Sequence, residues 1–326
     1  MTIKKGWIAL ASSLLLLGAI FLLLRGNNVD SLLEVWRRID SYSLVGAVAL
    51  AMGIQLAAAW RLQMIMSVDH SAASLASLTR IQLLSLFIAH GAPVSALADL
   101  AKVAVVSLRY DLSSARALRL IVYERVLGAV GLVFTGAIFL TLQFFFLSIP
   151  AHVFRIEAVL WAAGVGGIIT LIALSRLHIV TRFGLLNRII HGVFRLGFLL
   201  LQPSFAMQLL AATLLQVMLM GLCFLVLAQA MHLVLPTLEV MLFMPFISFI
   251  ASLPIFYLGW GAREAAVILT IGASAPLSSP ESVALSVAFG VCVFLTSLPG
   301  GVFWLMRPSM RKAVNVEIDR IQMTKD

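Results

Sequence analysis

Charged side chains interrupt several otherwise apolar segments of this sequence, and they are the residues best able to do chemistry. Arg263 and Glu264 follow directly on the break Gly259-Trp260-Gly261, and Pro254 precedes it. Proline removes a backbone donor and glycine permits a tight turn, so this break leaves N–H groups free where the next helix begins. A helix N-terminus and a guanidinium aimed at one point would suit an anion such as phosphate.

Two further charged pairs lie nearer the N-terminus. Glu124 and Arg125 are adjacent in a long apolar stretch, while Asp99 and Lys102 are three positions apart. Adjacent residues on a helix point about 100° apart, whereas residues three apart share a face. We therefore expect Glu124 and Arg125 to need other partners, and Asp99 and Lys102 to be able to pair.

These charges suggest contacts between the two halves of the chain. The arrangement we expect joins Glu124 to Arg263, and Glu264 to Arg125 or Lys102. Such pairs could be fixed ion pairs that hold helices in register, because breaking a buried pair costs about 3–5 kcal/mol. They could equally contact substrate, and the helix break favours that role for Arg263 in particular.

No arrangement typical of an enzyme accompanies these charges. We find no nucleophile beside a base, no nucleotide-binding loop and no histidine cluster with the spacing of metal ligands. Cys223 and Cys292 lie in apolar stretches, where we expect buried apolar side chains. Four glutamines are expected to form hydrogen bonds between helices: Gln55, Gln82, Gln143 and Gln216. The sequence thus predicts no catalytic residue, metal or cofactor.

The composition places these residues in a membrane protein. The chain is 62% hydrophobic and 11% charged, with a mean hydropathy of +1.07, whereas soluble domains have about 25% charged residues. We expect an all-α, polytopic fold with about six full spans, at 7–24, 43–60, 120–147, 156–174, 205–228 and 282–305. Two interrupted segments, 73–108 and 241–275, complete it. The net charge of +9 is explained by where the charges lie, so no nucleic-acid partner is expected.

Each interrupted segment is expected to be a re-entrant helical hairpin. The first breaks at Gly91-Ala92-Pro93 and the second between Pro254 and Gly261. The hairpins would enter from opposite sides and approach each other within the membrane. Such an inverted repeat is typical of transporters, with substrate near the midplane. The alternatives are two short spans or one kinked helix in each segment.

The distribution of basic residues predicts the orientation. Outside the membrane segments, 15 lysines and arginines fall on one side and only Arg25, Arg37, Arg38 and Arg155 on the other. The positive-inside rule then places both termini in the cytoplasm. Residues 176–203 read as a basic amphipathic helix that would attract anionic lipid headgroups, or as an ordinary basic linker.

These motifs resemble the flippase-like membrane domain of the lysylphosphatidylglycerol synthase family, over nearly the whole chain. The resemblance is carried by Pro254 with Gly259-Trp260-Gly261-Ala262-Arg263-Glu264, by Leu298-Pro299-Gly300-Gly301 and by Glu124-Arg125. Asp99 and Lys102 are similar to the family's Gly-Asp-x-x-Arg element. Here Ala98 replaces the glycine and lysine replaces the arginine, and lysine cannot form a bidentate fork with phosphate.

The resemblance implies a lipid transporter of the bacterial inner membrane, comprising a flippase-like domain at 1–306 and a cytoplasmic tail at 307–326. Its substrate would be an anionic amphiphile: a phospholipid, modified phospholipid, hopanoid or polyprenyl-phosphate lipid. No aminoacyl-transferase domain is expected after Met306, so lysyl transfer is not implied. The alternatives are an accessory subunit or enzyme of lipid or polyprenyl-linked glycan assembly, and a scaffold. A homo-oligomer or a lipid-biosynthesis enzyme is the partner left open.

Overall fold

The computed structural model describes residues 36–37, 39–69, 71, 73–91, 96–176, 196–253, 259–275, 277–306 and 316, and every regular element there is a helix. Five of these helices are long and apolar enough to cross a membrane. They are α3 (Ser41–Val68), α6 (Ser114–Phe146), α7 (Ala151–Arg176), α9 (Pro203–Ala230) and α13 (Ser279–Met306). The expected all-α, multi-pass membrane fold is confirmed, and the span expected at 7–24 lies outside the described residues.

Both interrupted segments are divided into shorter helices. The first consists of α4 (Leu75–Gly91) and α5 (Ala96–Tyr110), and the second of α10 (Thr237–Ser252), α11 (Ala262–Leu269) and the short α12 (Ile271–Ser274). The limbs α4, α5, α10 and α11 contain 17, 15, 16 and 8 residues, at or below the lower limit for a span.

Within each hairpin, the limbs pack against each other, so neither segment is one kinked helix. Pro93 and Pro254 lie outside the described residues, and the approach of the two hairpin tips stays a prediction.

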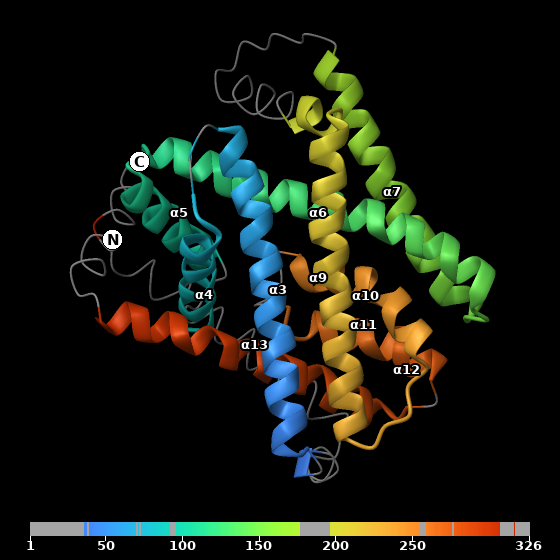
Figure 1. Ribbon diagram of the computed structural model, residues 1–326. Helices are drawn as coiled ribbons and strands as arrows, with labels where there is room; N and C mark the ends of the chain where they lie inside the picture. Colours follow the sequence, from blue (N-terminus) through green and yellow to red (C-terminus); the bar gives the residue numbers. More distant parts are fainter. Residues whose placement is uncertain are drawn as a thin grey trace, which may run out of the picture.

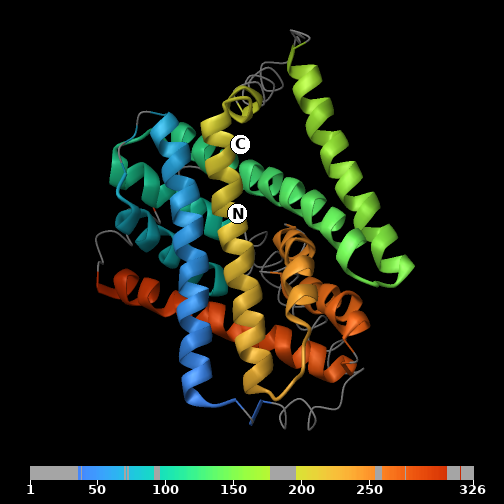
Figure 2. The same ribbon diagram turned by 45° about the vertical axis from the view of Figure 1, so that its right-hand side comes forward.

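The helices form two halves with matching contacts. In the first half, α3 precedes the α4–α5 hairpin and α6 follows it; in the second, α9 and α13 flank the α10–α12 hairpin. The helix after each hairpin packs against the hairpin of the other half, α13 on α4 and α6 on α10. Figures 1 and 2 show α3 and α9 side by side in opposite directions, and α6 and α13 crossing them, also in opposite directions. This is the arrangement of an inverted repeat.

The late motif Leu298-Pro299-Gly300-Gly301 brings α13 against the first hairpin. A Cβ on Gly300 would lie 2.3 Å from the carbonyl oxygen of Leu83, and one on Gly301 would lie 2.5 Å from the ring of Phe87. Only glycine permits this approach to the backbone of α4. These glycines therefore fix how the second half holds the first hairpin.

Helix α7 lies at the periphery and joins the molecule through α6 (Figures 1 and 2). The indole of Trp161 fills the space beside Gly136, where a Cβ would lie 2.4 Å away, and Val133 lies against Gly164. Trp161 also stacks edge to face on Phe249 of α10, with ring centroids 5.4 Å apart. The helix thus reaches the second hairpin through a few large side chains.

Candidate functional site: two charge clusters beside the hairpins

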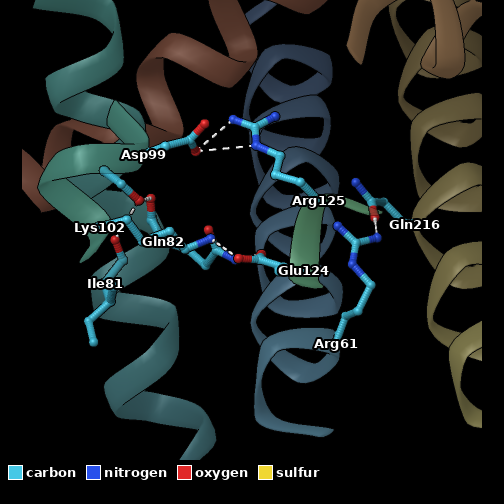
Figure 3. A network of polar contacts seen from close by, with 9 residues as sticks. Arg61, Ile81, Gln82, Asp99, Lys102, Glu124, Arg125 and Gln216 are labelled. Atoms are coloured by element: carbon cyan, nitrogen blue, oxygen red, sulfur yellow. Dashed lines mark hydrogen bonds and ion pairs between the residues drawn. The ribbon is translucent and has the colours of Figure 1, made fainter. Parts of the chain in front are cut away.

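The first charge cluster gathers polar side chains from both halves around the end of α5 that follows the first break. It consists of Arg61 from α3, Gln82 from α4, Asp99 and Lys102 from α5, Glu124 and Arg125 from α6, and Gln216 from α9 (Figure 3). All four predicted site residues of the first half therefore come together.

The interior of this cluster is an ion pair between α5 and α6. Nζ of Lys102 donates to Oε2 of Glu124, and Nε2 of Gln82 donates to Oε1 at 2.8 Å. Lys102 and Glu124 are 6% and 5% exposed. Both carboxylate oxygens thus have a donor, which a buried charge requires. The expected role of Gln82 as an interhelical hydrogen bonder is confirmed.

The outer part of the cluster is the pair between Arg125 and Asp99. Nη2 and Nε of Arg125 both donate to Oδ1 of Asp99, at 2.8 and 3.2 Å. The side chains are 57% and 35% exposed. Figure 3 shows Arg125 directed toward Asp99 while Glu124 is directed toward Gln82. Glu124 and Arg125 take separate partners as expected. The spacing of Asp99 and Lys102 allows them to pair, but each finds its counter-ion on α6 instead.

Arg61 belongs to this cluster, although the span expected at 43–60 ends just before it. Helix α3 continues to Val68, so Arg61 lies inside it. Its guanidinium lies over Gly128 of α6, and Nη1 donates to Oε1 of Gln216 at 3.0 Å. The apolar run after Arg61, beginning at Met64, is the signal that could have shown that the helix continues.

The second hairpin turns at two glycines. Gly259 and Gly261 have φ values of +78° and +84°, in the left-handed region that other residues rarely adopt. A Cβ on Gly259 would also lie 2.8 Å from the carbonyl oxygen of Ala251. The break expected before Arg263 is confirmed at these residues, and its glycines are required by the turn itself.

The second charge cluster begins immediately after this turn and comprises Trp260, Arg263, Glu264, Ser286 and Phe289. Glu264 is fully buried, and its Oε1 accepts from Nη2 of Arg263 and from Oγ of Ser286, both at 2.9 Å. Its Oε2 accepts from the backbone N–H of Gly261 at 2.6 Å. The carboxylate therefore caps α11 and neutralises Arg263 at once.

Arg263 is 5% exposed, and its guanidinium lies over two aromatic rings. The guanidinium carbon lies 5.1 Å from the ring centroid of Trp260 and 5.3 Å from that of Phe289, and Nε donates to Ser286 at 2.9 Å. A Cβ on Gly290 would lie 2.7 Å from Nη2. Two cation–π contacts and a missing side chain thus create a place for one guanidinium.

The expected pairing across the halves is wrong. Glu124 meets Lys102 rather than Arg263, and Glu264 meets its neighbour Arg263 rather than Arg125 or Lys102. The Cβ atoms of Arg263 and Glu264 point in different directions, but the long side chain of Arg263 bends back to the carboxylate of Glu264. Ser286 contacts both side chains. The anion that faces Arg263 and the start of α11 is accordingly Glu264.

A groove beside the first cluster carries two further arginines that the sequence analysis did not single out as site residues. It is lined by Ser77, Arg80, Ile81, Leu84, Val105, Arg109 and Phe303. Arg80 and Arg109 are exposed, and Arg80 lies over the ring of Phe303 at 5.7 Å. The lining contains no acidic residue, so the groove is basic with apolar walls.

Metal-ligand groups do not gather in the described part of the chain, where no three His, Cys, Asp or Glu side chains could hold an ion together. Cys223 and Cys292 are free and fully buried, as expected of small apolar side chains.

Comparison with known proteins agrees with this architecture. The model of the family described as the lysylphosphatidylglycerol synthase TM region matches residues 7–300. No curated protein matches the chain. The matched region includes both hairpins and both charge clusters. The chain therefore belongs to the lysylphosphatidylglycerol synthase transmembrane family.

Proposed function

We propose that this protein moves an anionic amphiphile across the membrane, using Arg125 to hold its charged headgroup. The observation that carries the proposal is that the Arg125 side chain is 57% exposed on α6, a helix long enough to cross the membrane. A charge in that position needs an anionic or aqueous surrounding. A lipid phosphate presented from the hydrophobic side of the membrane would supply it.

The charge balance of the first cluster favours an anion. It holds three basic side chains, Arg61, Lys102 and Arg125, against the two carboxylates Asp99 and Glu124. Lys102 and Glu124 neutralise each other in the interior. Arg125 can exchange the partly exposed Asp99 for phosphate, because a guanidinium binds either anion through two parallel donors.

The basic groove beside this cluster supports the same substrate class. Its arginines, Arg80 and Arg109, suit a phosphate, and Ile81, Leu84 and Phe303 suit an acyl or isoprenoid chain. It is built from α4, α5 and α13, so it adjoins the hairpin that carries Asp99. Under the predicted orientation, this groove would open toward the cytoplasmic side.

The second cluster plays a bracing role in this proposal. The substrate contacts expected at Arg263, Glu264, Gly259, Gly261 and Pro254 stay predictions. Arg263 already has a counter-ion and Gly261 already donates to it. We propose that the protein is a transporter in the inner membrane rather than an enzyme, with membrane lipid as its partner.

The test is reconstitution in liposomes that contain fluorescent anionic or zwitterionic lipids, with headgroup accessibility measured in each leaflet. Arg125→Gln should slow movement of the anionic lipid by about tenfold to a hundredfold, because a charge-assisted bidentate contact is worth about 1.5–3 kcal/mol. Arg125→Lys should retain part of the activity. Arg155→Gln is the matched control, since Arg155 is exposed on α7 and donates only to the Ala151 carbonyl within the described residues.

Two results would contradict the proposal. One is wild-type activity in the Arg125→Gln variant. The other is a wild-type protein that moves none of the anionic lipids tested, which would favour an accessory subunit or enzyme of lipid or polyprenyl-linked glycan assembly.

A further inference from the structure

A buried carboxyl in the peripheral helix α7 stands apart from both charge clusters. Glu157 is 1% exposed, although most of α7 faces outward. Its Oε2 accepts from Nε2 of Gln143 on α6 at 3.3 Å and from Nε1 of Trp161 at 3.4 Å. Both donors are neutral, so the carboxyl lies in an apolar setting with only weak polar support.

Among the described residues, no cation faces Glu157 from the helices that surround it. On α7 itself, His152 and Arg155 are exposed in the first turns, and Arg155 donates to a backbone carbonyl. Arg176 ends the same helix, 19 residues after Glu157 and so about 28 Å away. On α6 the nearest charged residue is Arg125, five turns from Gln143 and so about 27 Å away. On α10 the only charged group is the carboxyl of Glu239. A carboxylate buried in a membrane without a cation is strongly disfavoured.

Glu157 and Gln143 together lack one hydrogen-bond donor. Oε1 of Glu157 and Oε1 of Gln143 are both buried acceptors without a partner in the described structure. The carboxyl and the amide already share one hydrogen bond, from Nε2 of Gln143 to Oε2 of Glu157, so these two oxygens are the atoms left over. A proton on the carboxyl would let it donate to the amide oxygen and close a cyclic acid–amide pair. One proton would then satisfy both unpaired atoms.

We propose that Glu157 is a proton-binding site and that it is protonated in the packed state seen here. The proton comes from water and returns to water, without any redox step. Because Nε2 of Gln143 also donates to the Leu242 carbonyl at 3.0 Å, the protonated pair fastens α6 and α7 to α10. Loss of the proton leaves a buried anion that draws in water, which loosens the first limb of the second hairpin.

This site could couple lipid movement to protons, a consequence that rests on the proposed function. The existence of the proton-binding site does not depend on that function. Helix α10 packs against α6, α9 and α11, so loosening its contact with α7 acts on the hairpin that carries Arg263 and Glu264. Protonation would thereby set how firmly that hairpin is held.

Infrared difference spectroscopy on the protein in lipid nanodiscs tests protonation directly. At neutral pH the wild type should show the carbonyl band of a buried, protonated carboxyl, shifted in D2O. Glu157→Gln should lose this band, and the control Glu239→Gln should keep it. A wild type without the band at neutral pH would overturn the proposal and would indicate an ordered water or a carboxylate instead.

The pH dependence of the melting temperature provides a second measurement. The folded state holds the proton, while an unfolded, hydrated carboxyl releases it at acidic pH. The free energy of unfolding should therefore fall as pH rises from that acidic range up to neutral pH. Glu157→Gln should remove this slope, because an amide pairs with Gln143 without a proton. Equal slopes in both proteins would also overturn the proposal.

Transport then separates this inference from the proposed function. Lipid movement that responds neither to a proton gradient nor to Glu157→Gln would leave the proposed function intact and refute the coupling. Loss of movement in Arg125→Gln, together with an unchanged carboxyl band, would show that the two sites act separately.

Discussion

The two charge clusters occupy equivalent places in the two halves of the molecule, yet one includes an exposed charge and the other has only buried charges. Each joins the limb after a hairpin break to the helix that follows the hairpin, α5 to α6 in the first half and α11 to α13 in the second. The first cluster runs from the buried Lys102–Glu124 pair to the exposed Arg125. The second closes completely on Glu264.

This difference shows that an arginine–carboxylate pair inside a membrane fold can have either of two roles: it can brace the fold or present a charge to a ligand. Arg263 contacts two aromatic rings, a serine and a carboxylate, so its environment is complete without a ligand. Arg125 has one partly exposed counter-ion. We infer that the second cluster braces the fold and the first presents charge, and three substitutions test this contrast.

The largest effect is expected from Glu264→Ala. It leaves Arg263 as an unpaired buried cation and removes the cap of α11, so the free energy of unfolding should fall by about 3–5 kcal/mol. The melting temperature in detergent or nanodiscs measures this. Asp99→Ala is the matched control from the first cluster and should have a much smaller effect. Equal losses of stability in the two variants would contradict the inference that the second cluster braces the fold while the first presents charge.

Arg263→Lys should have an intermediate effect. Lysine keeps the charge but loses the Nε contact with Ser286 and part of the stacking between Trp260 and Phe289, a loss of about 1–2 kcal/mol. If Arg263 only braces the fold, lipid movement at a temperature well below the melting point should remain near wild type. A protein that stays folded but moves lipid several-fold more slowly would instead place a phosphate at Arg263.

The smallest effect on stability is expected from Asp99→Asn. Its pair with Arg125 is partly exposed, so the free energy of unfolding should change by at most about 1 kcal/mol. Because Asp99 competes with phosphate for the same guanidinium, its removal should raise the apparent affinity for anionic lipid, measured by quenching of a labelled lipid. A lower affinity would mean that Asp99 positions Arg125 rather than competing for it.

The fold was predictable from the sequence because hydropathy and helix-breaking residues act locally. The spans expected at 43–60, 120–147, 156–174, 205–228 and 282–305 correspond to α3, α6, α7, α9 and α13. The two breaks separate α4 from α5 and α10 from α11. The span expected at 7–24 and residues 177–195 of the basic stretch expected at 176–203 lie outside the described residues. Which residues are charged within the membrane was also clear from the sequence.

The partners of those charges were not predictable, because partner choice depends on helix register and side-chain reach. Arg61 stands near a predicted helix end, and only the full length of α3 brings it beside Gln216 and Gly128. Glu264 was expected to reach across the molecule, yet it meets its own neighbour because Ser286 and Gly290 shape the space around Arg263.

The sequence by itself determined that this chain is a multi-pass helical membrane protein, with two broken segments and charges placed beside them. Those properties follow from apolar length, from proline and glycine, and from the free-energy cost of charge in a membrane. The tertiary structure alone decided which charges are buried and paired and which are exposed. That outcome depends on the packing of α13 on α4 and α6 on α10, contacts between halves that no local pattern encodes.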